Sequence, residues 1–190
     1  LQVTPYYNKP TQEGIYRHFS TIADTCDIPI VLYNVPGRTG VGIAAETVAR
    51  LVKNRNVLGV KEAAGSVERV SEILSLCDTS IMCGDDSLTV PMMLLGAKGV
   101  ISVASNIIPA ELKKMTDACA SGDFATAVAM HRKYWRLFKD LFVESNPIPV
   151  KAAMAMLGMI EEEYRLPLCP LSDVNREKLR KTVSECIRSV

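Results

Sequence analysis

The sequence of 190 residues has no excess of charge of either sign and no apolar run long enough to cross a membrane. It contains 22 Lys and Arg against 21 Asp and Glu, so its formal net charge is +1. A balanced charge argues against an electrostatic surface for nucleic acid or acidic lipid. No apolar run approaches the roughly 20 residues of a transmembrane helix, and residues 1–5 show no signal segment. We therefore expect neither nucleic acid nor membrane among the partners of this protein.

Metal-binding patterns are also absent from the sequence. The six cysteines are irregularly spaced without a C-x-x-C pair, and there are only two histidines. These features predict neither a zinc site nor a disulfide framework. Asp85 and Asp86 have no further carboxylates at ligand spacing, which favours capping of the following helix over a cation site. We expect no bound metal, and reduced thiols in a cytoplasmic protein.

Short apolar runs alternate with segments of helical period along the first hundred residues. Each run is continuous, as in strands that are buried on both faces of a parallel sheet. Helical stripes such as Ile15, Phe19 and Ile22 separate the runs. This alternation predicts an α/β fold with right-handed crossovers. The five predicted strands lie within Leu1–Thr4, Ile28–Tyr33, Val57–Val60, Ser80–Cys83 and Gly99–Val103.

Of the two common α/β architectures, the sequence favours a (β/α)8 barrel over a doubly wound sheet. No G-x-G-x-x-G or Walker A loop follows an early strand, which disfavours a doubly wound nucleotide-binding sheet. Five βα units instead suit an incomplete (β/α)8 TIM barrel that lacks its first three units. We assign strands four to eight of the barrel to residues 1–106, and the last barrel helix with a C-terminal helical extension to residues 107–190. The helices expected there are Ala110–Ala120, Phe124–Phe142, Val150–Leu157 and Val174–Ile187.

Active sites of α/β proteins lie at the carboxyl ends of the strands, so the residues that follow each apolar run are the candidates. Lys61 comes directly after Val57–Val60, where partial burial lowers the pKa of an amine. Such an amine forms a Schiff base with a carbonyl substrate. The alternative is a lysine that extends from the strand end into solvent, paired with Glu62. The weaker candidates, in more polar or turn-like segments, are Lys53, Lys98 and Lys151.

Tyr33 and Arg38 follow the neighbouring strand. A tyrosine near the lysine can exchange protons during imine formation, although a tyrosine at the edge of the core, with its hydroxyl hydrogen-bonded, is the alternative. Arg38 lies in the turn Pro36–Gly40, where its guanidinium suits a substrate carboxylate, and the alternative is a solvated loop residue. Together the three side chains predict carbonyl chemistry on an acidic substrate.

Four short motifs carry a resemblance to a known family. They are Thr4–Asn8, Tyr33–Gly40, Gly59–Ala63 and Asn146–Lys151. In this order they resemble the dihydrodipicolinate synthase family, the lysine-pathway branch of the pyruvate-dependent class I aldolases that include N-acetylneuraminate lyase. The resemblance covers the whole chain, and Arg38 after Tyr33 favours the synthase branch over the sialic acid lyases.

The resemblance implies a lyase that condenses pyruvate with L-aspartate 4-semialdehyde to 4-hydroxy-tetrahydrodipicolinate in lysine and diaminopimelate biosynthesis. Lys61 would form the Schiff base with pyruvate, and Tyr33 would be the proton donor and acceptor. Tyr7 would extend the proton relay into the site of the neighbouring subunit. Arg38 would hold the carboxylate of the semialdehyde, and Ile101 would contact pyruvate through its backbone.

The resemblance also bears on cofactors and partners. No metal or organic cofactor is implied, because the covalent lysine imine with pyruvate is itself the electron sink. Tyr6 would line the cleft in which L-lysine inhibits many members of the family. The family is usually a homotetramer, a dimer of dimers.

One departure from the family leads to a further prediction. The Gly-Thr-Thr-Gly-Glu motif, which grips the pyruvate carboxylate from the first three units, is not in this sequence. We therefore predict a fragment of a longer enzyme. Two alternatives stay open: another pyruvate-dependent class I aldolase, acting on sialic acid or keto-deoxy sugar acids, and a non-catalytic truncated barrel.

Overall fold

The computed structural model describes residues 1–187 and contains two compact units, Leu1–Ile101 and a second that begins at Ser102. The division of the chain after residue 106, between barrel strands and C-terminal helices, stays a prediction from the sequence. Residues 188–190, which that partition assigned to the helical extension, lie outside the described residues.

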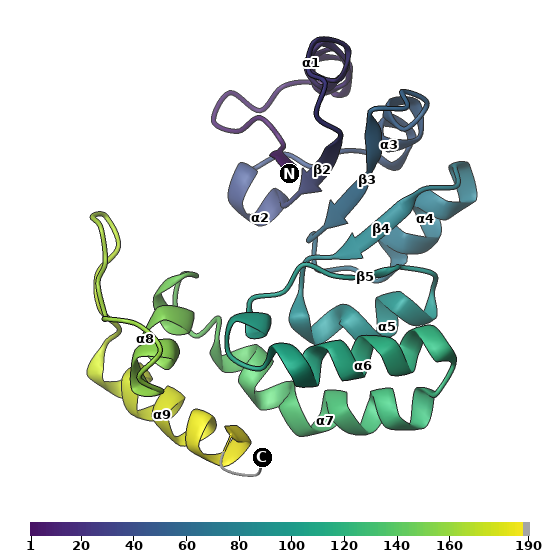
Figure 1. Cartoon of the computed structure of the whole chain (residues 1–190). Coiled ribbons are helices and arrows are strands. Elements are labelled where there is room, and N and C mark those ends of the chain that lie inside the picture. Colours follow the sequence, from purple (N-terminus) through teal and green to yellow (C-terminus); the bar gives the residue numbers. More distant parts are fainter. Residues whose placement is uncertain (188–190) are drawn as a thin grey trace. The chain divides into compact units, whose positions relative to one another are not determined.

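The first unit is built on a parallel sheet whose strand order follows the chain, β1-β2-β3-β4-β5 (Figure 1). The order never reverses, and a doubly wound sheet needs such a reversal. Sequential parallel strands are instead the pattern of a barrel wall. The strands are β1 (Gln2–Val3), β2 (Ile30–Asn34), β3 (Val57–Glu62), β4 (Ser80–Cys83) and β5 (Gly99–Val100).

Helices connect these strands and pack beside one another on the sheet. Helix α1 contacts α3, and α3 contacts α4 (Figure 1). Thr11 caps α1 as the sequence indicates, because its side chain accepts a hydrogen bond from the backbone N–H of Gly14. The helices of this unit are α1 (Gln12–Thr25), α2 (Pro36–Thr39), α3 (Ala45–Leu51), α4 (Glu68–Leu76), the 3-10 helix η1 (Asp86–Leu88) and α5 (Thr89–Leu94).

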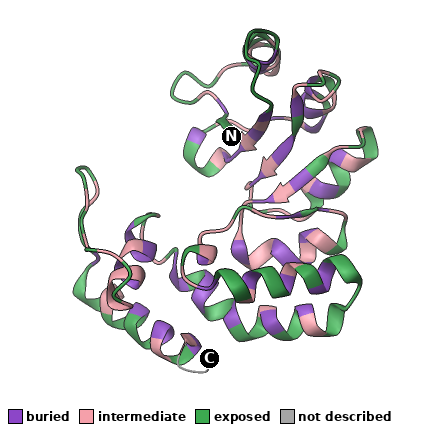
Figure 2. Cartoon of the chain, viewed as in Figure 1, coloured by how far each residue is buried: buried purple, intermediate pink, exposed green. Residues whose placement is uncertain are grey.

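The core of the first unit lies between the sheet and these helices. Apolar side chains at helical spacing, such as Ile15 and Phe19 of α1, meet strand residues such as Leu32, Val60 and Ile81, and all five are fully buried. Figure 2 shows the buried positions concentrated on the strands and on one side of each helix. Removal of this apolar surface from water is the main stabilising contribution. It fixes the strand ends on which the candidate residues lie.

The second unit is helical in its described part. It contains η2 (Ala104–Asn106), α6 (Pro109–Ser121), α7 (Phe124–Asp140), α8 (Ile148–Met156) and α9 (Asp173–Ile187), which agree with the expected helices within one or two residues at each end. The buried carboxylate of Asp140 on α7 accepts a hydrogen bond from Thr182 of α9 at 2.6 Å and pairs with Lys178 at 2.9 Å.

Three local predictions need correction. Strand β5 is shorter than Gly99–Val103, because the chain turns toward η2, where Ser102 accepts a hydrogen bond from the Ser105 backbone. Arg38 lies on a short helix rather than in a turn. Asp85 occupies the N-cap position of η1 without a capping hydrogen bond from its side chain.

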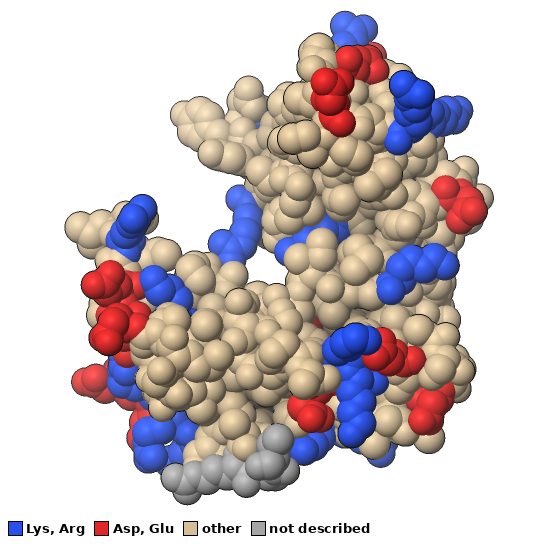
Figure 3. All heavy atoms as spheres, in the orientation of Figure 1, with Lys and Arg blue, Asp and Glu red and all other residues tan. Residues whose placement is uncertain are grey.

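The charged surface agrees with the balanced composition. Figure 3 shows acidic and basic side chains next to one another over α1 and α3, where Glu13 pairs with Arg17 and Arg50. Among residues 1–187, no helix combines the length and the apolar character that a membrane crossing requires.

Candidate active site at the carboxyl end of the sheet

The register of β2 and β3 brings Tyr33 and Lys61 together. The two residues are direct partners in the parallel pair, so their side chains leave the sheet on the same face. The Lys61 Nζ lies 4.2 Å from the centroid of the Tyr33 ring. A cation at this distance from a ring face is attracted by the ring quadrupole. The lysine and tyrosine that the sequence singles out are therefore in contact.

The environment of Lys61 shifts its protonation toward the neutral amine. Burial lowers the pKa of Lys61, and this effect outweighs the negative charges of Asp85 and Asp86, which act in the opposite direction. Both aspartates follow β4, the next strand of the sheet. A buried amine with acidic neighbours can lose a proton and still be protonated again during a reaction.

Sequence reasoning missed the close approach of Gly84 to Lys61. A Cβ at position 84 would lie 2.5 Å from the Ala63 Cβ and 3.1 Å from the Lys61 Cε. The Gly84 N–H also donates to the Glu62 carbonyl at 2.8 Å. Only a residue without a side chain allows β4 to pass this close to the lysine. The position of Gly84 directly after a predicted strand was the available signal.

Tyr33 is anchored by its backbone while its ring faces the lysine. Its carbonyl accepts hydrogen bonds from the Thr4 backbone N–H at 3.1 Å and from the Thr4 hydroxyl at 2.9 Å. Burial raises the pKa of the Tyr33 hydroxyl, Arg38 opposes the rise and Asp85 adds to it. The hydroxyl therefore stays protonated at neutral pH and can donate a proton.

Arg38 is held on α2, which directly follows β2. Pro36 stands in the first turn of this helix and Gly40 ends it with a positive φ of 71°. The guanidinium acts electrostatically on both Tyr33 and Lys61, since its positive charge lowers the pKa of each group. The structure thus places Arg38 in the electrostatic environment of the pair.

The alternative in which Glu62 pairs with Lys61 is wrong. The Glu62 side chain is 1% exposed and forms its ion pair with Arg69. Its carboxylate also accepts hydrogen bonds from Asn34 and from the Ala64 backbone. Adjacent residues of a strand point to opposite faces, so Glu62 and Lys61 occupy different sides of the sheet.

The remaining predicted site residues, Tyr6, Tyr7 and Ile101, follow the two outer strands of the sheet. Tyr6 and Tyr7 follow β1 and are 65% and 92% exposed, and Tyr7 has a positive φ of 66°. Ile101 follows β5, and its N–H donates to the Cys83 carbonyl at 2.9 Å. The roles that the resemblance implies for these three residues stay predictions.

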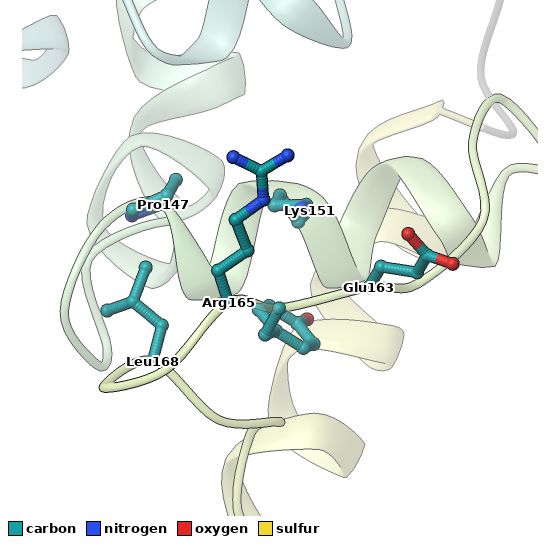
Figure 4. Close-up of a pocket in the computed structure, with 6 residues that line it drawn as sticks. Pro147, Lys151, Glu163, Arg165 and Leu168 are labelled. Atoms are coloured by element: carbon teal, nitrogen blue, oxygen red, sulfur yellow. The ribbon is translucent and has the colours of Figure 1, made fainter.

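Of the three weaker candidates for a Schiff-base lysine, Lys151 is the one that contacts a tyrosine. It lies on α8 with its Nζ 5.4 Å from the ring centroid of Tyr164. It lines a cavity of about 590 Å³ together with Arg165 and Leu168 (Figure 4). The cavity is open, and Arg165 is exposed. Lys53 and Lys98 are exposed as well, so among these four lysines Lys61 alone contacts a tyrosine at a strand end.

The cysteines of the described residues are all unpaired. Cys83, Cys119 and Cys186 are buried, and Cys26 and Cys169 are exposed. Burial raises the pKa of the Cys83 thiol to about 12, so this group next to the site is not a thiolate nucleophile. Within residues 1–187, His, Cys, Asp and Glu side chains form no cluster of three or more that could hold a metal ion.

Comparisons with known proteins identify the family of this chain. The model of the dihydrodipicolinate synthetase family matches residues 1–186. A 4-hydroxy-tetrahydrodipicolinate synthase of Sulfurihydrogenibium sp. is 56% identical over 187 residues, which are 96% of this chain and 64% of the relative.

Two solved structures extend the similarity to the fold. Dihydrodipicolinate synthase from Aquifex aeolicus has a TM-score of 0.94 and 50% identity, over 96% of this chain and 64% of that one. The enzyme from Acinetobacter baumannii, solved in complex with pyruvate, has a TM-score of 0.94 and 44% identity, over 97% of this chain and 64% of that one.

These similarities confirm the predicted fold class, an α/β fold that forms part of a (β/α)8 barrel and carries five consecutive βα units. The chain spans about 64% of the length of the relatives that it matches. Lys61 and Tyr33 are in contact on neighbouring strands of these five units. This chain belongs to the dihydrodipicolinate synthetase family.

Proposed function

We propose that this chain supplies the Schiff-base lysine of a lyase that condenses pyruvate with L-aspartate 4-semialdehyde to 4-hydroxy-tetrahydrodipicolinate. The observation that carries the proposal is the half-buried Lys61, whose pKa is lowered by burial and whose Nζ lies 4.2 Å from the Tyr33 ring centroid. The relatives named for this activity, one of them solved with pyruvate, support the assignment.

In the proposed reaction the neutral amine of Lys61 attacks the ketone carbon of pyruvate. Tyr33 donates a proton to the oxygen that leaves as water, and the imine forms. Loss of a proton from the pyruvate methyl group gives an enamine, which attacks the aldehyde carbon of the semialdehyde. The amine of the semialdehyde then closes the ring and displaces Lys61, so the lysine is regenerated and no cofactor is consumed.

The other predicted residues take supporting roles in this proposal. Arg38 binds the carboxylate of the semialdehyde through a charge-assisted pair, and the backbone of Ile101 contacts pyruvate. Tyr7 passes protons in the relay of an adjoining subunit within a dimer of dimers. Tyr6 lines a cleft for L-lysine. The high exposure of both tyrosines suits residues that serve an interface or a cleft.

Borohydride trapping tests the Schiff base directly. The full gene product that contains this chain is incubated with pyruvate and borohydride, and the adduct is located by peptide mass spectrometry. We expect one reduced pyruvate adduct, on Lys61, and none in Lys61→Ala. The matched control Lys151→Ala should retain it. A wild-type protein without an adduct, or with one on another lysine, would contradict the proposal.

The acceptor is tested separately at Arg38. Arg38→Ala should still form the pyruvate adduct but lose turnover of aspartate semialdehyde, by roughly 100-fold if a carboxylate anchor is removed. Full turnover in this variant would favour another pyruvate-dependent aldolase of the same superfamily. A protein that neither binds pyruvate nor forms an adduct would support the non-catalytic alternative.

A further inference from the structure

A group of three polar side chains lies on the face of the sheet opposite the Tyr33–Lys61 pair. Asn34 and Glu62 are register partners at the ends of β2 and β3, one residue after the reactive pair. Arg69 on α4 completes the group. Asn34 is 2% exposed and Glu62 is 1% exposed, so neither side chain can reach a substrate in solution.

Glu62 is the centre of the group. The Asn34 Nδ2 lies 2.9 Å from both carboxylate oxygens of Glu62, the Ala64 N–H donates to Oε1 at 2.9 Å, and the Arg69 Nε lies 3.4 Å from Oε2. Each of these polar neighbours is a donor. Burial of a carboxylate costs free energy unless donors surround it, so the position calls for an acceptor-only group.

The group also holds together the two ends of the loop from Asn34 to Ile43, which carries Arg38. The loop leaves β2 at Asn34 and returns at Ile43, whose N–H donates to the Asn34 Oδ1 at 3.0 Å. The Ile43 carbonyl accepts a hydrogen bond from Arg69 at 2.8 Å. Both backbone polar groups of Ile43 are therefore held by residues that Glu62 orients, and α2 with Arg38 lies between the two anchor points.

We propose that Asn34, Glu62 and Arg69 are positioning residues that hold the Arg38 helix at a fixed place relative to Lys61. This inference rests on the proposed function, in which Arg38 binds the acceptor and Lys61 binds pyruvate. The network sets affinity for the acceptor carboxylate, because the loop that it closes carries Arg38. It contributes less to imine formation, because Lys61 is held by the continuous backbone of β3 between two paired strands.

The variant Glu62→Gln tests the network with little change in shape. Its amide NH2 would face the donors of Asn34 and Arg69, so one of these contacts must open. We expect the KM for aspartate semialdehyde to rise about tenfold, since small misplacements of a binding group have large effects. The rate of pyruvate adduct formation at Lys61 should change less than about threefold.

A second substitution should rescue the first. In Glu62→Gln combined with Asn34→Asp, the new amide at position 62 can donate to a carboxylate at position 34, which still accepts from the Ile43 N–H. We expect Asn34→Asp alone to be at least as impaired as Glu62→Gln, because it places two carboxylates within hydrogen-bond distance. The double variant should recover most of the lost affinity for the semialdehyde.

Asn56→Asp is the matched control for a purely structural effect. The Asn56 Nδ2 donates to the carbonyls of Ala23 at 3.1 Å and Cys26 at 2.7 Å, immediately before the other end of β3. This variant should lower the free energy of unfolding, measured in urea, and leave the semialdehyde KM within about twofold of the wild-type value.

Four outcomes decide the inference. A Glu62→Gln protein that loses stability with an unchanged KM would show a structural role only and overturn it. An equal loss of pyruvate adduct formation would place the effect on Lys61 and also overturn it. Absence of the adduct in the wild-type protein would refute the proposed function and, with it, this inference. The split between KM and adduct formation, together with rescue in the double variant, would establish it.

Discussion

At Lys61, burial and the neighbouring carboxylates act in opposite directions on the protonation of the amine. Burial disfavours the ammonium and is the larger effect, whereas the carboxylates of Asp85 and Asp86 favour it. A Schiff base forms only from the neutral amine, so the balance sets the pH range in which the lysine reacts. The aspartates keep the pKa from falling further.

Removal of the Asp85 charge should lower the pKa of Lys61 further. In Asp85→Asn the ammonium loses its strongest favourable neighbour, so the pKa of Lys61 falls further below its ordinary value. The rate of pyruvate adduct formation should then begin to rise at a lower pH than in the wild type. Measurement of trapping rates across pH tests this, with Asp78→Asn as a control, because Asp78 acts on Cys77 and not on Lys61. An unchanged profile, or a shift to higher pH, would contradict the prediction.

The pairing of β3 with β4 depends on glycines at both ends. A Cβ at Gly59 would lie 2.1 Å from the Ser80 carbonyl oxygen, and one at Gly84 would lie 2.5 Å from the Ala63 Cβ. Both distances are shorter than non-bonded carbon contacts allow. The strands approach closely because neither glycine carries a side chain, and Gly84 does so at the end that holds Lys61.

Gly84→Ala should separate the two strands next to the lysine. The added methyl group meets Ala63 and the Lys61 Cε, and relief of such overpacking costs roughly 1–3 kcal/mol of stability. We expect a lower midpoint in urea unfolding together with slower adduct formation. Gly14→Ala, on α1, is the control: its Cβ would meet Pro10 at an ordinary 3.4 Å, and stability should rise by about 0.5–1 kcal/mol. A Gly84→Ala protein with wild-type stability would argue against the close approach.

At the scale of the whole molecule, the sheet of the first unit has β1 and β5 as its outermost strands. Among the strands of residues 1–187, β1 pairs with β2 alone, and both of its residues, Gln2 and Val3, are exposed. Strand edges with free backbone groups pair with other chains. The part of the sheet in this chain therefore has an edge that a covering strand would protect.

A protein of residues 1–190 alone should self-associate through this edge. We expect its apparent mass, measured by light scattering after size-exclusion chromatography, to increase with concentration. Val3→Lys should weaken the association, because a charged side chain on an edge strand opposes pairing. The matched substitution Val128→Lys, on the exposed part of α7, should leave it unchanged. A monomer at all concentrations would refute the prediction.

Much of the fold and the central pair of the site could be predicted from the sequence. Continuous apolar runs indicated four of the five strands, and Leu1–Thr4 resembled the tail of another; Ser80–Cys83 matches β4 residue for residue. Buried strands leave little choice of residue, so their pattern is plain in the sequence. Sequential strands also place Lys61 and Tyr33 at neighbouring strand ends. The family resemblance of these motifs was confirmed by the match over residues 1–186.

Other features depended on contacts between distant residues. The sequence suggested that Glu62 could pair with its neighbour Lys61, yet its partners are Asn34 and Arg69. The register between β2 and β3 decides this, because the alternation of side chains sends Lys61 to one face of the sheet and Glu62 to the other. The close passage of Gly84 arises in the same way, from the packing of segments that are far apart in the chain. The residues at the strand ends could therefore be read from the sequence. Which of these residues meet depends on strand register and packing, because these set the direction of each side chain and its distance from the others.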